Sequence, residues 1–261
     1  MIKLETDKKY RMSIRIHADG FSLFIYLPIE SSKPIYTYEY DAEETLSVTA
    51  NLKIAYKKLP WMSHPFERVY VTVDNAMWTL VPLSLFKPEY AEGYYYQNLP
   101  KRPNEKVLHD ILPSSDLAIL YAIDRTALEQ LQHYYGQTLV CYAQYTPLLV
   151  ELSFEGKKSI SRKLFAIQVD DHLQLIAMHG GELELVNQVY APVPSDRSYY
   201  IFNTWRTLGY DQEADELLLI GHEQVEEAKQ LLDLLKPYIA HVGVSPSSFN
   251  DLDALLRCEM L

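Results

Sequence analysis

The chain has 261 residues and a formal net charge of -11 at pH 7, with 48% hydrophobic and 23% charged residues. This length is sufficient for two domains of ordinary size or one large domain, and the composition argues against extended disorder. The negative charge repels phosphate backbones and anionic lipids, and no sizeable basic patch offsets it. We therefore expect neither nucleic acid nor a membrane surface as a partner.

Short patterns exclude further classes of protein. No apolar run approaches the roughly 18 to 20 residues of a membrane span, and the charged start MIKLETDKKY is unlike a signal peptide, so we expect a cytoplasmic protein. Cys141 and Cys258 are too far apart for a CxxC site, and both are predicted to be small buried residues. Glycine, at nine residues, has about half of its usual share of roughly 7%, so phosphate-cradling loops are poorly provided for.

The first half of the chain is predicted to begin with a meander of three strands. Alternating apolar residues predict strands 12–17 and 21–27, joined by a turn at Ala18-Asp19-Gly20, and a third strand over 34–40. A helix is predicted from Asp41, as its N-cap, to residue 58. The elements predicted next are strands 68–75 and 77–86, an irregular aromatic stretch over 90–106, strand 116–123, helix 124–136 capped by Asp124, strand 137–144 and a helix beginning near Tyr145.

The opening pattern returns after a polar stretch around Gly156. Strands are predicted at 164–169, 172–179 and 182–191, with turns at Asp170-Asp171 and Gly180-Gly181. The elements predicted after them are helix 195–209 capped by Ser195 or Asp196, strand 214–221, helix 222–238, strand 239–244 and a last helix from Ser248. Each half thus contains a βββαβαβα unit, and we expect an α/β protein with mixed sheets and two duplicated domains, residues 1–155 and 156–261.

Four segments carry a resemblance to a known superfamily. They are SIRIHADGFSLFIY, VTVDNAMWTLVPLSLF, LFAIQVDDHLQLIAMHGGELEL and DELLLIGH. Together with the repeated unit and an aspartate at the first hairpin of each copy, they resemble the actin-like ATPases, whose domains are ribonuclease H-like and which include actin, sugar kinases, FtsA and PilM. The chain is more closely similar to an uncharacterised bacterial family with this fold and no assigned activity.

The resemblance implies a nucleotide cleft at three turns. In active members, two D-x-G turns and a late glycine turn hold the phosphates, the metal and the adenosine. Here Gly20 follows Asp19 directly, so the first turn is one residue short, and Asp170-Asp171 has no glycine. The third turn keeps one glycine. The candidate nucleotide-cleft residues are therefore Asp19, Gly20, Asp170, Asp171, Gly221 and His222.

These residues also have a plain structural interpretation, which we favour. Asp19 and Gly20 suit a hairpin turn because both tolerate a positive φ. Adjacent residues of a strand end, such as Asp170 and Asp171, point to opposite faces and seldom share a metal. We therefore predict no catalytic residue among them.

The histidines and the common catalytic motifs predict no site either. His17 is separated from Asp19 by a turn, whereas His172 and His179 are an odd number of residues apart and face oppositely, so no metal site is expected. The chain lacks HExxH, G-x-S-x-G and G-x-x-x-x-G-K-[ST] motifs, and Cys141 has no evident activating neighbour.

Two tyrosine clusters complete the pattern. Tyrosines 36, 38 and 40 are predicted to line one face of a strand and to pack there. The second cluster falls in the irregular stretch, where tyrosines precede basic residues, a composition typical of protein interfaces. The candidate interface residues are Tyr94, Tyr95, Tyr96, Lys101 and Arg102.

The leading hypothesis is a two-domain actin-like protein without nucleotide chemistry that binds a protein partner as an interaction or scaffold protein and needs no cofactor. The alternative is a switch or phosphotransferase that binds Mg-ATP through atypical loops. A filament-forming protein is a third hypothesis. If nucleotide turnover needs all three turns together, their joint departure from the pattern favours the first hypothesis.

Overall fold

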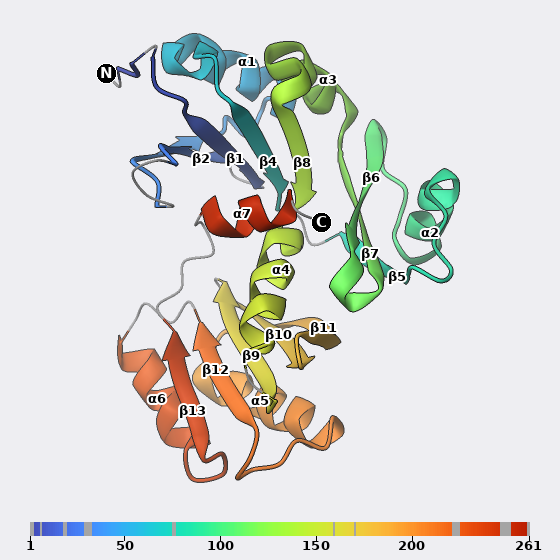
Figure 1. Cartoon of the computed structure of the whole chain (residues 1–261), viewed down its shortest axis with the longest axis vertical. Helices are drawn as coiled ribbons and strands as arrows, with labels where there is room; N and C mark the ends of the chain where they lie inside the picture. Colours follow the sequence, from blue (N-terminus) through green and yellow to red (C-terminus); the bar gives the residue numbers. More distant parts are fainter. Residues whose placement is uncertain are drawn as a thin grey trace. The chain divides into compact units, whose positions relative to one another are not determined.

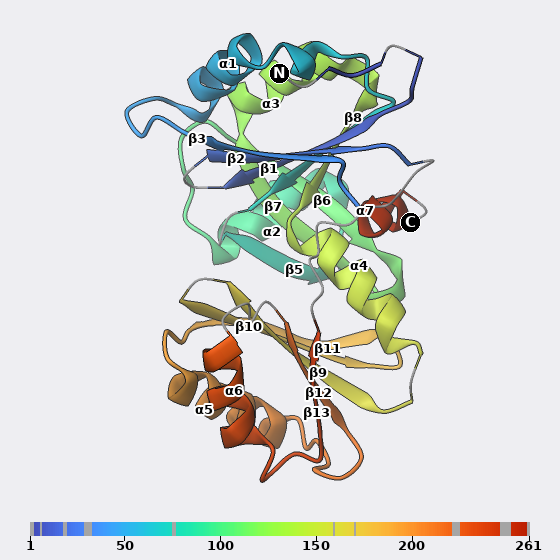
Figure 2. The same ribbon diagram turned by 90° about the vertical axis from the view of Figure 1, so that its left-hand side faces the viewer.

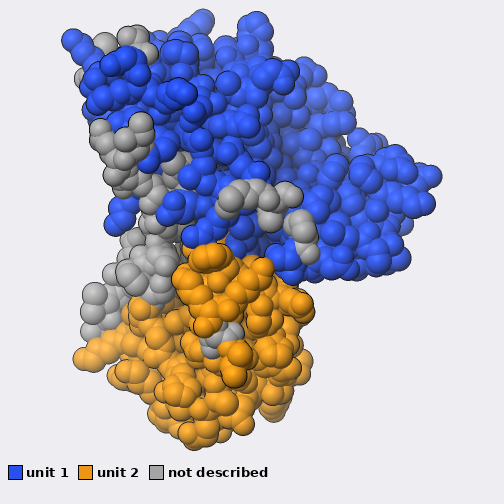
Figure 3. Space-filling model, viewed as in Figure 1, with its two compact units in different colours: residues 1–150, 250–261 blue, residues 151–249 orange. Residues whose placement is uncertain are grey.

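The computed structural model of the chain describes residues 3–5, 7–17, 20–28, 33–74, 77–158, 160–169, 171–220, 225–245 and 252–259. The chain (Figure 1) groups into two compact units: unit 1 holds residues 1–150 and 250–261, and unit 2 holds residues 151–249 (Figure 3). None of the helices in the described stretches is long and apolar enough to cross a membrane.

Unit 1 is built on a five-stranded mixed sheet with the strand order β3-β2-β1-β4-β8. The first three strands form the predicted antiparallel meander, and β4 and β8 extend the sheet in parallel with β1. Helices α1 and α3 lie over one face of this main sheet (Figure 2). The bounds are β1 Arg11–His17, β2 Gly20–Tyr26, β3 Tyr36–Asp41, β4 Arg68–Val73, β8 Leu139–Ala143, α1 Val48–Lys58 and α3 Arg125–Tyr135.

A small antiparallel sheet with the order β5-β7-β6 lies between β4 and α3 in the chain. Its elements are β5 Trp78–Pro82, α2 Ala91–Asn98, β6 Glu105–Leu112 and β7 Leu117–Asp124. The prediction of an irregular stretch over 90–106 is therefore wrong. Helix α2 and strand β6 form because the fully buried Tyr95 packs in one core with Val107 and Leu120, a contact that AEGYYYQN alone does not indicate.

Unit 2 repeats the topology of the main sheet, with the strand order β11-β10-β9-β12-β13. Again a three-stranded meander is extended by two strands parallel to its first strand. Leu164, Leu217, Trp205 and Leu235 contribute to its buried core. The bounds are β9 Arg162–Val169, β10 His172–His179, β11 Glu182–Tyr190, α5 Pro194–Thr207, β12 Glu216–Ile220, α6 Val225–Leu235 and β13 His241–Ser245. The predicted α/β class and the duplication are confirmed.

Two predicted helix starts are wrong, and a third is confirmed. Helix α1 begins after Ser47, whose hydroxyl accepts from the Ala50 N–H, because Asp41 is the last residue of β3. Helix α5 begins at Pro194, ahead of the predicted caps, since proline suits the first turn of a helix. Asp124 caps α3 as predicted, with its carboxylate accepting from the Ala127 N–H.

The unit division differs from the predicted boundary in one respect. Helix α4 (Tyr145–Gly156) contains the division, after Val150, close to the expected residue 155. Helix α7 (Leu252–Cys258), expected in the second domain, groups with unit 1 because Leu255 packs with Phe24 and Tyr70 of the main sheet. Short 3-10 turns occur at Pro60–Ser63, Pro88–Tyr90, Pro113–Ser115 and Gly136–Thr138.

Candidate functional site

The main sheet of unit 1 carries a polar cluster at the carboxyl ends of its parallel strands. Arg15 lies near the end of β1, and Asp74 and Gln144 directly follow β4 and β8. The guanidinium of Arg15 donates to Asp74 Oδ2 through Nε at 3.0 Å and Nη2 at 2.6 Å. We assign the Gln144 amide so that its oxygen accepts from Arg15 Nη2 at 2.7 Å and its nitrogen donates to Asp74 Oδ2 at 3.0 Å. These three residues form the Arg15 cluster.

The Arg15 cluster continues into a row of polar side chains across the sheet. Strand register places Ser22 and Thr72 on either side of Arg15, and Glu39 beside Ser22. Cross-strand neighbours share one face of a sheet, so Glu39, Ser22, Arg15 and Thr72 form a polar row. The Ser22 hydroxyl donates to Glu39 Oε2 at 2.6 Å. Arg15 and Ser22, two of the donors of the row, are thus each bonded to a carboxylate.

This edge is where a ligand site is expected in the fold. In open α/β sheets, ligands bind beyond the carboxyl ends of the strands. Arg15, Asp74 and Gln144 were missed by sequence reasoning, which looked for glycine turns. The signal that finds them is the position of Asp74 and Gln144, each immediately after a largely apolar parallel strand.

Gly20 is the first residue of β2 and pairs with His17 and with Asp41. A Cβ atom at this position would lie 2.0 Å from the Tyr40 carbonyl oxygen and 3.0 Å from the Ala42 nitrogen. Glycine is therefore required by the close approach of the β3 backbone. That requirement accounts for Gly20 without a phosphate.

The other predicted cleft residues are only partly described. Asp19, Asp170, Gly221 and His222 lie outside the described residues. Asp171 is exposed, and its carbonyl oxygen accepts from the Ala191 N–H at 2.8 Å. No group of three or more metal-binding side chains gathers anywhere in the described stretches.

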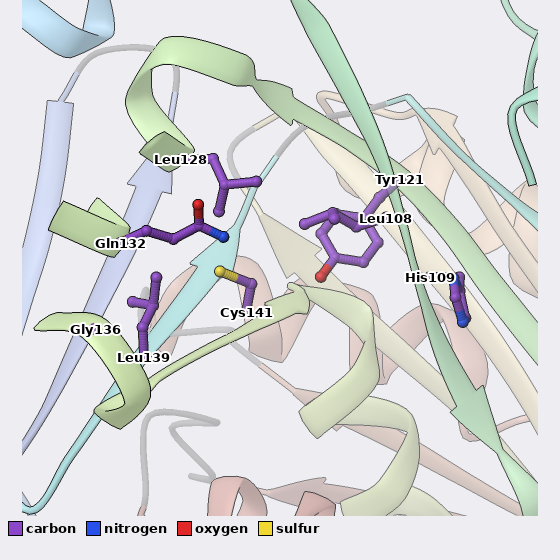
Figure 4. A pocket seen from close by; sticks show the side chains of 8 residues that line it. All are labelled: Leu108, His109, Tyr121, Leu128, Gln132, Gly136, Leu139 and Cys141. Atoms are coloured by element: carbon purple, nitrogen blue, oxygen red, sulfur yellow. The ribbon is translucent and has the colours of Figure 1, made fainter. Parts of the chain in front are cut away.

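A pocket of about 300 Å³ opens beside the small sheet, between β6, β7, α3 and β8 (Figure 4). Burial, and then the Asp110 charge, raises the pKa of the Cys141 thiol to about 12, so this thiol stays protonated and is a poor nucleophile. Burial lowers the pKa of His109, which favours its uncharged form. The pocket is lined by Leu108, His109, Tyr121, Leu128, Gln132, Gly136, Leu139 and Cys141.

A buried carboxylate joins the small sheet to the start of α4. Asp110 on β6 is 8% exposed, and its Oδ2 accepts from the Ala143 N–H at 2.8 Å and the Thr146 hydroxyl at 2.5 Å. The Tyr121 hydroxyl donates to Oδ1 at 3.3 Å. Burial raises the pKa of Asp110 to about 6, and the three hydrogen bonds oppose the shift only in part. Sequence reasoning had no signal for this residue, because β6 itself was not predicted.

The predicted interface tyrosines lie on helix α2 rather than in a loop. Tyr95 is fully buried, and its hydroxyl donates to the Met77 carbonyl. Tyr94 donates to the Leu85 carbonyl at 2.7 Å, and the Lys101 ammonium lies 5.3 Å from the Tyr96 ring centroid. Lys101 and Arg102 are exposed. The larger exposed apolar side chains near α2 are Leu85 and Tyr90, 64% and 58% exposed, which sequence reasoning missed.

Comparison with solved structures defines the class of the fold. A protein from Bacteroides thetaiotaomicron, described as having an actin-like ATPase fold and unknown function, is 32% identical over 99% of both chains, with a TM-score of 0.81. A chain from a PilM-PilN type IV pilus biogenesis complex is 12% identical, covers 96% of this chain and 97% of its own, and has a TM-score of 0.56. A Ppx/GppA phosphatase from Aquifex aeolicus is 11% identical, with 97% and 100% coverage and a TM-score of 0.52. The fold is that of the actin-like ATPases.

The family model for proteins of unknown function DUF3822 matches residues 2–242, and the chain belongs to this family. A search of curated proteins found no match. The predicted resemblance to an uncharacterised family with an actin-like ATPase fold is confirmed. The fold neighbours at 11% and 12% identity share the architecture alone.

Gly20→Ala is expected to destabilise the protein by about 2 to 4 kcal/mol, because the new Cβ would displace the β3 backbone. Gly93→Ala is the matched control: it lies in α2 with nothing within 4 Å, and we expect a gain of about 0.5 to 1 kcal/mol from helix propensity. Urea denaturation measures both. A Gly20→Ala protein as stable as the wild type would contradict the strand-contact role.

Asp110→Asn is expected to change how stability depends on pH. The folded-state pKa of about 6 exceeds the ordinary 3.8, so the Asp110 contribution to stability increases as pH falls from about 7 to 4. Across that range, wild-type stability relative to the variant should rise by up to about 3 kcal/mol, from (6 − 3.8) × 1.36. Urea denaturation at stepped pH measures this difference. Asp116→Asn, an exposed aspartate in the next turn, should leave the pH profile unchanged, and equal profiles for the two variants would refute the prediction.

Proposed function

We propose that this protein is a non-catalytic interaction protein that uses the actin-like ATPase fold to bind a protein partner. The observation that carries the proposal is the polar row of the main sheet, in which the one guanidinium and the serine hydroxyl are both bonded to carboxylates of the same chain. A group engaged in this way is not available to an incoming phosphate without first breaking its bond.

The electrostatics of the polar row support the same conclusion. Asp74 and Glu39 place two carboxylates in the polar row, against the single guanidinium of Arg15. A triphosphate that approached the row without its metal ion would be repelled by these like charges. Arg15 and Asp74 are also only about a quarter exposed, which reduces screening of their attraction for each other. To bind at the polar row, Mg-ATP would have to break the Arg15–Asp74 ion pair, and its own contacts would have to compensate for the free energy lost with that pair.

The region around α2 supports a role in protein binding. Leu85 and Tyr90 are exposed apolar side chains, and Lys101 and Arg102 are exposed basic ones. Tyrosine and arginine are enriched at protein interfaces, where a flat aromatic ring contributes much contact area for little loss of conformational freedom. Although the chain as a whole carries a formal charge of -11, Lys101 and Arg102, which follow α2, form a local basic site that attracts an acidic partner.

The nucleotide test is a thermal-shift series with Mg-ATP, Mg-ADP and Mg-GTP, each against MgCl₂ alone. We expect no shift in Tm. A bound nucleotide at a hundred times its Kd would add about 2.7 kcal/mol, or roughly 5 to 10 °C for a chain of this size. A shift of that size that Asp19→Asn abolishes would overturn the proposal in favour of a Mg-ATP switch or phosphotransferase.

The interface test reverses charge beside α2. The double variant Lys101→Glu/Arg102→Glu should lose specific partners that the wild type captures from a lysate and that are quantified by mass spectrometry, because both side chains are exposed. Lys53→Glu, an exposed lysine of α1, is the matched control and should retain them. Identical partner sets for all three proteins would remove α2 as the binding surface.

A further inference from the structure

The last helix of the chain lies on the main sheet, on the face opposite α1 and α3 (Figure 2). Leu255 of α7 is 6% exposed and packs with Phe24, Tyr26 and Tyr70. Val140 and Tyr142 of β8 extend the same contact. We call these five sheet residues, Phe24, Tyr26, Tyr70, Val140 and Tyr142, the aromatic strip.

A polar clamp fastens the end of α7 to the same sheet. Glu259 Oε1 accepts from Arg68 Nε at 2.9 Å and from the Tyr70 hydroxyl at 3.0 Å. Its Oε2 lies 3.8 Å from Arg11 Nη1. The side chains of Arg68 and Glu259 are 40% and 23% exposed, so dissolved ions screen the attraction between these two charges.

Helix α7 depends on this docking for its own existence. It has seven residues, fewer than an isolated helix needs to be stable in water. Among its described side chains, Ala254, Leu255 and Cys258 are buried, and Leu256 packs against the same sheet residues. A single short helix held by a few side chains and one clamp opens at far lower free energy than a five-stranded sheet unfolds.

We propose that α7 is a releasable latch over a helix-binding surface, and that the partner supplies a short amphipathic helix with a carboxylate at its last turn. Released, the latch uncovers Phe24, Tyr26 and Tyr70 and leaves Arg11 and Arg68 beside them. Aromatic side chains flanked by arginine are the composition of binding hot spots. The kind of partner is inferred from α7 itself. The spacing of the apolar side chains in α7 and the carboxylate that follows it show what this surface of the sheet binds. The proposed partner site rests on the proposed function as an interaction protein. The release of α7 from the sheet does not rest on that function.

The two cysteines of the chain separate the opening of α7 from the reactivity of the main sheet, since Cys258 lies in α7 and Cys141 on β8. Cys258 is buried in α7, and its thiol donates to the Ala254 carbonyl, so it reacts with a thiol reagent when α7 opens. Cys141 belongs to β8, where it is partly exposed and lines the pocket, and its raised pKa of about 12 makes it react slowly whether or not α7 is docked. In the full-length protein, mass spectrometry should find Cys258 modified at least tenfold faster than Cys141. Equal rates for the two thiols would overturn the latch.

Variants of the clamp sharpen the test. Glu259→Gln should speed Cys258 modification about five- to tenfold, and raising NaCl from about 50 to 500 mM should speed it severalfold in the wild type only. Leu255→Ala should speed it about a hundredfold or more. Glu129→Gln, an exposed glutamate of α3, is the matched control and should match the wild type. Cys141 rates should not change in Glu259→Gln, and no effect of Glu259→Gln on Cys258 would refute the clamp.

A labelled peptide of residues 250–261 probes the partner site on the full-length proteins by fluorescence anisotropy. It should bind the Leu255→Ala protein at least tenfold more tightly than the wild type, whose own α7 occupies the strip. Equal binding to both, or binding to neither, would overturn the partner site. Self-association of Leu255→Ala in light scattering without peptide binding would also overturn it, in favour of a second copy as occupant. A nucleotide-dependent Tm shift would instead refute the proposed function and leave the Cys258 result standing.

Discussion

Strand β1 is the element on which the rest of unit 1 depends. It pairs antiparallel with β2 and parallel with β4, so it joins the meander to the parallel half of the main sheet. Its even-numbered residues Met12, Ile14 and Ile16 are all buried, whereas Arg11 and Arg15 alternate with them. Because successive side chains of a strand point to opposite faces, this alternation gives the sheet one apolar and one partly polar face. The apolar face supplies the core, and the polar face supplies every candidate surface discussed above for that sheet.

The two arginines of β1 explain how that polar face is neutralised. Each lies partly buried and each is held by carboxylates: Arg15 by Asp74, and Arg11 by Glu67 together with Glu259. A partly buried guanidinium without such partners would be costly, so the carboxylates that pair with it are required by the fold. These ion pairs therefore contribute to the stability of the sheet. Under the proposed function, they also occupy the groups that a nucleotide site at this edge would use.

Local patterns in the sequence predicted the order of the main strands and helices. The small sheet and the ion pairs depend on long-range contacts, which local patterns do not reveal. The meander, the Asp124 cap and the repeated topology follow from alternation, turn chemistry and capping, all of which act within a few residues. Helix α2 and strand β6 escaped prediction because Tyr95 and Val107 meet only after the small sheet has formed. The pairing of Arg15 with Asp74 spans 59 residues, and that of Arg68 with Glu259 spans 191, so neither has a local signature. Gly20 was predicted in a turn but is the first residue of β2, and its strict requirement comes from the neighbouring strand β3.

The two arginine sites of β1 differ in what holds their carboxylates, and this difference is why the proposed latch lies at the Arg11 end. Asp74 directly follows β4, and its N–H donates to the Ile16 carbonyl, so the backbone that carries this carboxylate is held by the sheet. Glu259 follows a seven-residue helix held by a few side chains, so its bonds to Arg68 and Tyr70 open with that helix. One face thus carries an ion pair whose two backbones belong to the sheet and a detachable pair whose carboxylate follows α7. A partner that competes for the detachable pair also gains the aromatic strip beneath it, whereas a ligand at the Arg15 end gains no comparable apolar surface. Under the proposed latch, selection of a binding partner depends on how readily α7 leaves the sheet rather than on the Arg15 end of the fold.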